Sequence, residues 1–155
     1  MTYSTTQGLN GAVYALHSDH EGVIWVATRD TVLRLVDGRL TPIKMPLGTR
    51  FTRLASLSSD SKGNLWIADF YQGVFRWSNG QLTKFPDTTK DGQVSQLVYV
   101  DASDRVWIGL APGALGEVKD DGTLRLYRRE QGITGFVTAL HEDGAGRLWI
   151  ATDNS

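Results

Sequence analysis

The sequence predicts an all-β protein made of repeated antiparallel sheets, and three observations support this prediction. A phrase consisting of an acidic residue, a turn and an apolar run centred on tryptophan occurs four times along the 155 residues. The tryptophans follow one another at intervals of 41, 41 and 42 residues, at Trp25, Trp66, Trp107 and Trp149. No window places apolar residues at the spacing of a stable helix. A period of this length indicates a repeat architecture.

The first strand of each repeat is a short apolar run that ends shortly before the acidic residue. These runs cover residues 13–16, 54–57, 95–98 and 137–140, and the acids are Asp19, Asp60, Asp101 and Asp143. Three residues after the acid stands Gly22, Gly63 or Gly146, and Asp104 in the third repeat. A glycine there fits a hairpin whose last loop residue has positive φ. The aspartate that opens such a turn normally accepts backbone N–H groups two residues later.

The second strand is the tryptophan run, which is apolar at consecutive positions, so both of its faces should be covered. The third strand covers residues 32–36, 74–77 and 115–118, and the fourth covers 40–43, 82–85 and 124–127. Between them stand the hairpin dipeptides Asp37-Gly38, Asn79-Gly80 and Asp121-Gly122. Pro42 restricts its strand to an outer edge. We therefore assign structural roles to the four tryptophans and to Gly38, Gly80 and Gly122.

Four antiparallel strands in each repeat, covered on both faces, describe the blades of a β-propeller. We expect the end of a preceding blade's outer strand at 1–9, because the segment from Tyr3 to Gly8 recurs from Tyr127 to Gly132. Three full blades follow at 10–50, 51–92 and 93–134, with the first half of a fourth at 135–155. A β-sandwich is the alternative, but it gives no reason for the tryptophans and turns to recur in phase.

The repeated motif resembles the two-component regulator propeller repeat. That repeat reads Asp-x-x-Gly-x-Leu-Trp-Ile-Ala/Gly-Thr and continues with Gly-Val/Leu-x-Arg. Residues 60–77 and 143–152 match it best. The resemblance implies the sensing region of a bacterial histidine kinase or diguanylate cyclase, in a periplasmic or other extracytoplasmic location. The first repeat departs at Asp30-Thr31-Val32. The third carries Ala111-Pro112-Gly113-Ala114, which we interpret as an insertion that remodels the loop between its second and third strands.

Composition and motifs exclude several functions. Lys and Arg number 16 against 17 Asp and Glu, without a basic stripe, which argues against nucleic-acid partners. With no cysteine there is neither a disulfide nor a thiolate zinc site. No apolar run reaches the roughly 20 residues that span a bilayer, so we expect no membrane contact by this segment. Nucleophile and phosphate-loop motifs are missing. We therefore expect no enzyme activity, catalytic residue, cofactor or metal, and interpret His17 and His141 as polar strand ends.

Recognition is expected on the loops, where the repeats differ from one another. In propellers the connection from the second to the third strand and the connection to the next blade share one face. The candidate ligand-binding residues on that face are Arg29, Asp30, Arg50, Phe70, Tyr71, Gln72, Asp87, Lys90 and Pro112. The Phe70-Tyr71 pair is the most suggestive, because two large aromatic side chains stand in a turn. The alternative interpretation is that these two rings cap the edge of the blade.

The sequence favours a non-catalytic sensing or interaction module that binds a small molecule, a glycan or a protein. One alternative is a lyase-type propeller enzyme with a metal-assisted acid/base site. A second alternative is a purely structural, self-assembling propeller fragment. Because the array would leave two apolar blade faces in water, we expect either a piece cut from a longer propeller or a homodimer. Two copies would join head to tail and close a ring of about seven or eight blades. A closed four-bladed monomer is the remaining alternative.

Overall fold

The computed structural model describes residues 2–46, 48–85 and 93–153, and these residues form four antiparallel sheets in sequence order. The first sheet holds β1 (Ala15–Ser18), β2 (Ile24–Ala27), β3 (Val32–Val36) and β4 (Arg39–Pro42). The second holds β5 (Leu54–Ser59), β6 (Leu65–Asp69), β7 (Gly73–Ser78) and β8 (Gln81–Phe85). The third holds β9 (Val94–Val100), β10 (Val106–Ala111), β11 (Ala114–Val118) and β12 (Leu124–Tyr127). The fourth has two strands, β13 (Phe136–Glu142) and β14 (Leu148–Asp153).

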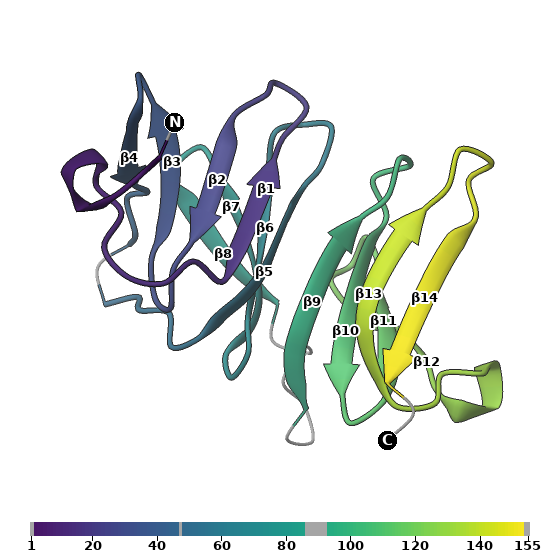
Figure 1. The fold of residues 1–155 in the computed structure, drawn as a ribbon. Helices are drawn as coiled ribbons and strands as arrows, with labels where there is room; N and C mark the ends of the chain where they lie inside the picture. The colour runs from purple at the N-terminus through teal and green to yellow at the C-terminus, as the bar shows by residue number, and fades with distance from the viewer. Residues whose placement is uncertain (1, 47, 86–92, 154–155) are drawn as a thin grey trace.

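Each sheet is an up-and-down meander, and successive sheets follow one another along an arc, with β1–β4 at one end and β13–β14 at the other (Figure 1). The predicted fold class, an all-β propeller array with three full blades and part of another, is confirmed. β1 lies slightly later than predicted, because its pairing runs from Ala15↔Ala27 to Ser18↔Ile24. Pro42 ends β4, which is an edge strand and needs no N–H there.

The hairpins between third and fourth strands are of two kinds. Asp37 and Gly38 have φ of 48° and 76°, and Asn79 and Gly80 have φ of 49° and 80°. Positive φ at both central residues is the type I′ geometry, whose twist matches that of the strands. In the third sheet β11 ends at Val118 and β12 begins at Leu124, and in this longer connection only Gly122 has positive φ, at 82°. The same dipeptide signal therefore produces a longer turn there.

The expected insertion in the third repeat is a tighter turn instead. Ala111 and Ala114 are the end residues of β10 and β11, and Leu110 pairs with Ala114. Only Pro112 and Gly113 remain between the two strands. The third repeat holds no extra residue relative to the second, because Trp107 pairs with Glu117 over the same ten residues as Trp66 with Arg76. Its loop is shorter because the two alanines continue the strand pairing.

Each interior tryptophan is buried against the following sheet. Trp25 joins a cluster with Leu57 and Ile67 of the second sheet, and Trp66 joins one with residues of the third. Trp107 packs in the same way against the fourth sheet. Their exposed fractions are 4, 5 and 7 %. Trp149 differs, with an exposed fraction of 59 %, because no described sheet follows β14.

Hydrogen bonds join the first strands of neighbouring sheets at a constant spacing. They are His17 Nε2 with Ser59 Oγ at 2.7 Å, Ser56 Oγ to Val98 O at 3.1 Å, Val100 N to Ser58 Oγ at 3.0 Å, and Glu142 N to the Tyr99 hydroxyl at 3.0 Å. Their partners lie 42 or 43 residues apart, about one repeat. Burial lowers the pKa of His17, against the opposing effect of Asp19.

The N-terminal segment copies the connection between the third and fourth sheets. Thr5–Gln7 form a 3-10 helix, η1, that ends at Gly8 with φ of 93°. Arg129–Gln131 form the matching helix η3, which ends at Gly132 with φ of 88°. Tyr3 packs against the first sheet, as Tyr127 packs at the junction of the third and fourth. Residues 2–9 contain no strand.

Candidate ligand-binding face

The two ends of the sheets carry different chemistry. The first and second strands of each sheet are joined at one end, which we call the clamp end. There Asp19, Asp60, Asp101 and Asp143 each bind an indole N–H. The opposite end, the loop face, holds the connections β2–β3, β6–β7 and β10–β11, and the described connections β4–β5 and β12–β13 between sheets (Figure 1). The candidate binding residues predicted from the sequence fall on the loop face. Asp87 and Lys90 lie outside the described residues.

At the clamp end each aspartate holds its turn and its tryptophan together. Asp60 Oδ1 accepts the N–H groups of Lys62 and Asn64 at 3.1 and 2.9 Å, and Oδ2 accepts the indole N–H of Trp66 at 3.1 Å. The other indole bonds are Trp25 to Asp19 at 2.8 Å, Trp107 to Asp101 at 2.9 Å and Trp149 to Asp143 at 2.8 Å. Sequence reasoning anticipated the turn bonds but missed the indole bond, whose signal is the constant spacing of six residues.

At Asp19, Asp101 and Asp143 these bonds favour the ionised carboxylate. Burial raises the pKa of Asp101, but the hydrogen bonds from Trp107, Arg105 and Ser103 outweigh burial, and the pKa lies below its ordinary value. At Asp143 the bonds from Trp149 and Arg147 lower the pKa to about 2. The carboxylates therefore act as fixed acceptors. The described residues contain no group of three or more His, Cys, Asp or Glu side chains placed to hold a metal.

On the loop face, buried Asp69 organises the turn after β6. Its carboxylate accepts the N–H and hydroxyl of Thr52 at 2.5 and 2.7 Å and the N–H groups of Arg53, Tyr71 and Gln72, each at 3.0 Å. Burial raises the pKa of Asp69, and the bonds from Thr52, Arg53 and Gln72 bring it below its ordinary value. This one side chain thus fixes the β6–β7 turn against the segment that enters β5.

The Phe70 and Tyr71 rings lie beside a cation. The Arg53 guanidinium is 4.5 Å from the centroid of the Phe70 ring, and the two rings meet edge to face at 5.0 Å. The backbone of Phe70 joins two sheets, because its N–H donates to Arg53 and its carbonyl accepts from Ser95. Phe70 is therefore held in place, whereas Tyr71 is 60 % exposed and presents its ring to solvent.

Four other residues predicted to bind ligand do not line one common cavity. Gln72 Nε2 donates to the Arg50 carbonyl at 2.6 Å, and both residues line a cavity of about 400 Å³ with Lys84. Arg50 and Asp30 line a second cavity, of about 230 Å³. Arg29 uses its carbonyl to accept the N–H of Leu54 and lines neither cavity.

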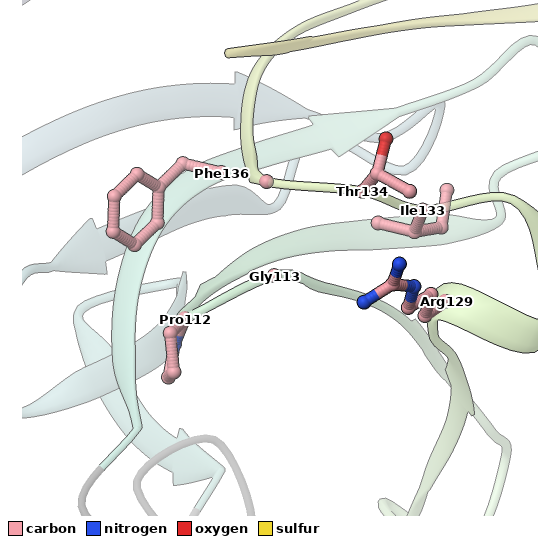
Figure 2. Close-up of a pocket in the computed structure, with 7 residues that line it drawn as sticks. Pro112, Gly113, Arg129, Ile133, Thr134 and Phe136 are labelled. Carbon is pink, nitrogen blue, oxygen red and sulfur yellow. The ribbon is translucent and has the colours of Figure 1, made fainter. Parts of the chain in front are cut away.

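Pro112 lines a larger cavity, of about 530 Å³, where the third and fourth sheets meet on the loop face. The other lining residues are Gly113, Arg129, Ile133, Thr134, Gly135 and Phe136. Figure 2 shows the Phe136 ring and Pro112 on one side and the Arg129 guanidinium on the other, with Gly113 between them. The volume lies within the usual range of about 300–1,000 Å³ for small-molecule sites. Cation and apolar surface thus face the same space.

Close backbone contacts shape this cavity. Gly135 has φ of 90°, and a Cβ there would stand 1.7 Å from the Asp153 carbonyl oxygen. A Cβ on Gly113 would stand 3.2 Å from the Gly135 carbonyl oxygen. The Phe136 N–H donates to Asp153 Oδ1 at 2.6 Å, which fixes the start of β13. Sequence reasoning found Pro112 but not Arg129 or Phe136. The only sequence signal for this part of the cavity was the pair Gly132 and Gly135. The segment between these glycines is too short to show a periodic pattern.

Arg129 is exposed on η3 and makes no ion pair with any other described residue. Ile133, by contrast, is buried at 6 % exposure and anchors the segment beneath the cavity. An uncompensated guanidinium presents several N–H donors in a plane, which suits a carboxylate or another planar anion.

Successive antiparallel sheets packed face to face through tryptophan define this chain as a β-propeller array. Two of its segments, residues 7–30 and 131–154, match the family model described as "Two component regulator propeller". These two segments therefore match the two-component regulator propeller repeat, and the resemblance seen in the sequence is confirmed there. A comparison with curated proteins found no match.

Solved structures share the fold. The extracellular domain of the one component system BT4673 from B. thetaiotaomicron matches with a TM-score of 0.76 and 20 % identity, over 97 % of this chain and 22 % of that one. Virginiamycin B lyase from Staphylococcus aureus matches with a TM-score of 0.59 and 10 % identity, over 93 % of this chain and 64 % of that one. This chain thus spans about a fifth of the length of the first protein. Among the described residues, no helix is long and apolar enough to cross a membrane.

Proposed function

We propose that this chain is a non-catalytic sensing module of an extracytoplasmic bacterial signalling protein, and that it binds a small anionic ligand on its loop face. The observation that carries the proposal is the cavity of about 530 Å³ that places the Arg129 guanidinium opposite Phe136 and Pro112. The match to the two-component regulator propeller repeat and the likeness to the extracellular domain of a one component system support the signalling context.

The lining selects a ligand with two chemical features. The Arg129 guanidinium can donate two parallel hydrogen bonds to a carboxylate. The Phe136 ring and Pro112 provide an apolar wall, on which an aromatic ring or the C–H face of a sugar can pack. Acidic sugars combine both features, so a uronic acid or a short acidic glycan is the ligand class that fits best.

A ligand here would touch two sheets at once. Pro112 and Gly113 belong to the β10–β11 turn of the third sheet, whereas Phe136 begins β13 of the fourth. Occupation of the cavity would stabilise one packing of these sheets over others, because a ligand shifts a conformational equilibrium by its differential affinity for the states. Such a shift at a sheet junction is the signal that the module would pass to a neighbouring domain.

Calorimetric titration of the chain with glucuronic-acid oligosaccharides, beside the matching neutral glucose oligosaccharides, tests the proposal. We expect binding of the acidic series and at least about tenfold weaker binding by Arg129→Gln, since a hydrogen bond to a charged group contributes about 1.5–3 kcal/mol. Arg39→Gln is the matched control, because Arg39 is also exposed, on β4, and lines no part of this cavity.

Equal binding of neutral and acidic sugars, or equal losses in Arg129→Gln and Arg39→Gln, would refute the assigned role of Arg129. The rival lyase activity requires an acid/base pair and a metal. Among the described residues that line this cavity, none is Asp, Glu or His, which favours binding over catalysis. A rise in melting temperature on adding Mg²⁺ or Mn²⁺, with consumption of virginiamycin B, would instead support the lyase.

A further inference from the structure

One further cavity lies at the clamp end, between the second and third sheets. Its volume is about 250 Å³, and it shares no lining residue with the cavity around Arg129. One wall is formed by Trp66, Arg76 and Phe85 of the second sheet, and the other by Val106 and the neighbouring turns of the third. Both are interior sheets of the arc, with the first and fourth sheets on their other faces (Figure 1). The cavity therefore lies within the blade packing of this chain.

Arg76 lines this cavity with an unused hydrogen-bond donor. Its Nε–H is buried and has no hydrogen-bond partner, and its guanidinium forms no ion pair with any other described residue. The side chain is held by the Trp66 ring, whose centroid lies 5.8 Å from Arg76 Cζ and which also contacts the Phe85 ring at 5.0 Å. A buried donor without an acceptor is costly, and more so on a charged group. An acceptor that enters the cavity would remove this cost.

The residue that pairs with the tryptophan from the third strand differs between the three complete sheets. In the first sheet it is Arg34, which is exposed, so water can accept its N–H groups. In the third sheet it is Glu117, whose carboxylate accepts the Tyr127 hydroxyl at 3.0 Å and pairs with Lys119 at 2.8 Å. In the second sheet it is Arg76, which is partly buried and unpaired. The unused donor is therefore specific to this junction and is not a property of the repeat.

The acids that line the cavity limit the charge of what it can hold. Asp60 already accepts two turn N–H groups and an indole N–H. Asp104 accepts the N–H and hydroxyl of Ser61, and these bonds, together with the nearby Lys62 charge, lower the pKa of Asp104. Asp120 also lines the cavity and is exposed. Three carboxylates would repel a dianion such as phosphate, whereas a single carboxylate needs only one guanidinium.

We propose that this cavity binds the carboxylate of a small, partly apolar monoanion, with the Arg76 Nε–H and a neighbouring Nη–H as paired donors. A planar guanidinium donates two parallel hydrogen bonds to a carboxylate. Phe85, Val106 and Val118 provide an apolar wall for the rest of the ligand. The volume is slightly below the usual range of about 300–1,000 Å³ for small-molecule sites, which restricts the ligand to a small one. This site is independent of the acidic-sugar site proposed above.

The NMR signal of the Arg76 Nε–H reports this contact directly. Proton–nitrogen spectra of the whole chain are recorded during titration with sodium benzoate and, separately, with neutral benzamide. The signal is identified by its loss in Arg76→Lys. We expect a saturable shift with benzoate and none with benzamide at the same concentrations. The Arg34 Nε–H is the internal control, because Arg34 holds the same register position beside Trp25 but is exposed and lines no part of the cavity.

Calorimetric titration with benzoate measures the affinity. The chain used carries Arg129→Gln, so that the loop-face cavity does not contribute. We expect Arg76→Lys to weaken binding by at least about tenfold, because lysine cannot make the paired bonds. Arg34→Lys should leave the affinity unchanged, and melting temperatures show whether each variant is folded.

Four results would overturn the proposal. The first is an Arg76 signal that benzoate does not move, which would mean that water alone satisfies the Nε–H. The second is an equal shift with benzamide. The third is tighter binding of inorganic phosphate than of benzoate, and the fourth is an equal loss of affinity in Arg76→Lys and Arg34→Lys.

Discussion

The clamp end and the loop face of this propeller array are built from the same strands but differ in how strictly they repeat. At the clamp end all four aspartates make the same bonds to a turn and an indole. On the loop face the turns after the second strands have four, three and two residues, and each has its own contacts. Repetition at one end fixes how the sheets pack, which leaves the other end free to vary. A recognition site is therefore expected where the bonds differ.

We expect the largest loss of stability from a substitution in the repeated tryptophan packing. Trp66→Ala should lower the free energy of unfolding by about 3–5 kcal/mol, since it removes a buried aromatic ring from the junction of the second and third sheets. Denaturant unfolding measures this change. Trp149→Ala is the internal control and should cost about 1 kcal/mol or less at concentrations where the chain is monomeric, because its ring is exposed. Equal losses would mean that burial does not distinguish the two tryptophans.

The next largest effect is expected when one of the four clamp aspartates is removed. Asp101→Ala should cost about 1–3 kcal/mol at neutral pH, because the Trp107 indole and the N–H groups of Ser103 and Arg105 lose their acceptor. The pKa of Asp101 is lower in the folded chain than its ordinary value of 3.8. The stabilisation is therefore present above pH 3.8 and is lost as the pH falls through the folded pKa.

Unfolding of wild type and Asp101→Ala should therefore be followed from pH 7 to pH 2. The difference in stability between the two proteins should be constant near neutrality and should shrink below pH 3.8. A difference that grows on acidification would show that the clamp does not depend on the ionised carboxylate.

A third comparison concerns the type I′ turn between β7 and β8. Gly80 has φ of 80° with open space around it, so Gly80→Val introduces backbone strain alone, at a cost of about 1–3 kcal/mol. Asn79→Asp should change stability by less than about 0.5 kcal/mol, since Asp37 already adopts φ of 48° at the same position of the first sheet. Thermal unfolding of both variants is sufficient. Similar losses would mean that the turn does not require positive φ at the glycine.

The smallest expected effect lies on the loop face. Tyr71→Ala should leave the free energy of unfolding within about 0.5 kcal/mol of wild type, because the ring is exposed and the turn is held through the Tyr71 backbone N–H. Chemical denaturation measures it beside Trp66→Ala. A loss of more than about 1 kcal/mol would show that the Phe70–Tyr71 pair caps the blade and is part of the scaffold.

The fold was predictable because the periodic features are also the structural ones. Tryptophan, the preceding acid and the turn glycines recur in phase, and each has a fixed backbone or packing role. The loop face was only partly predictable. Phe70, Tyr71 and Pro112 stood out as unusual residues in turns, but Arg129 and Phe136 acquire their place from the 3-10 helix η3 and the close approach of Gly135 to Asp153. Neither of these leaves a periodic pattern in the sequence.

The bonds that join the first strands set the unit by which such a chain can change its length. Ser56, Ser58 and Ser59 each reach a partner 42 residues away, in the neighbouring sheet. Inserting a single residue within β5 would turn the hydroxyls on one side of the insertion to the other face of the strand and break their ties. Duplicating or deleting a whole repeat leaves every tie intact. Genes for arrays of this kind are therefore expected to grow and shrink by complete repeats, with ring size as the quantity that varies.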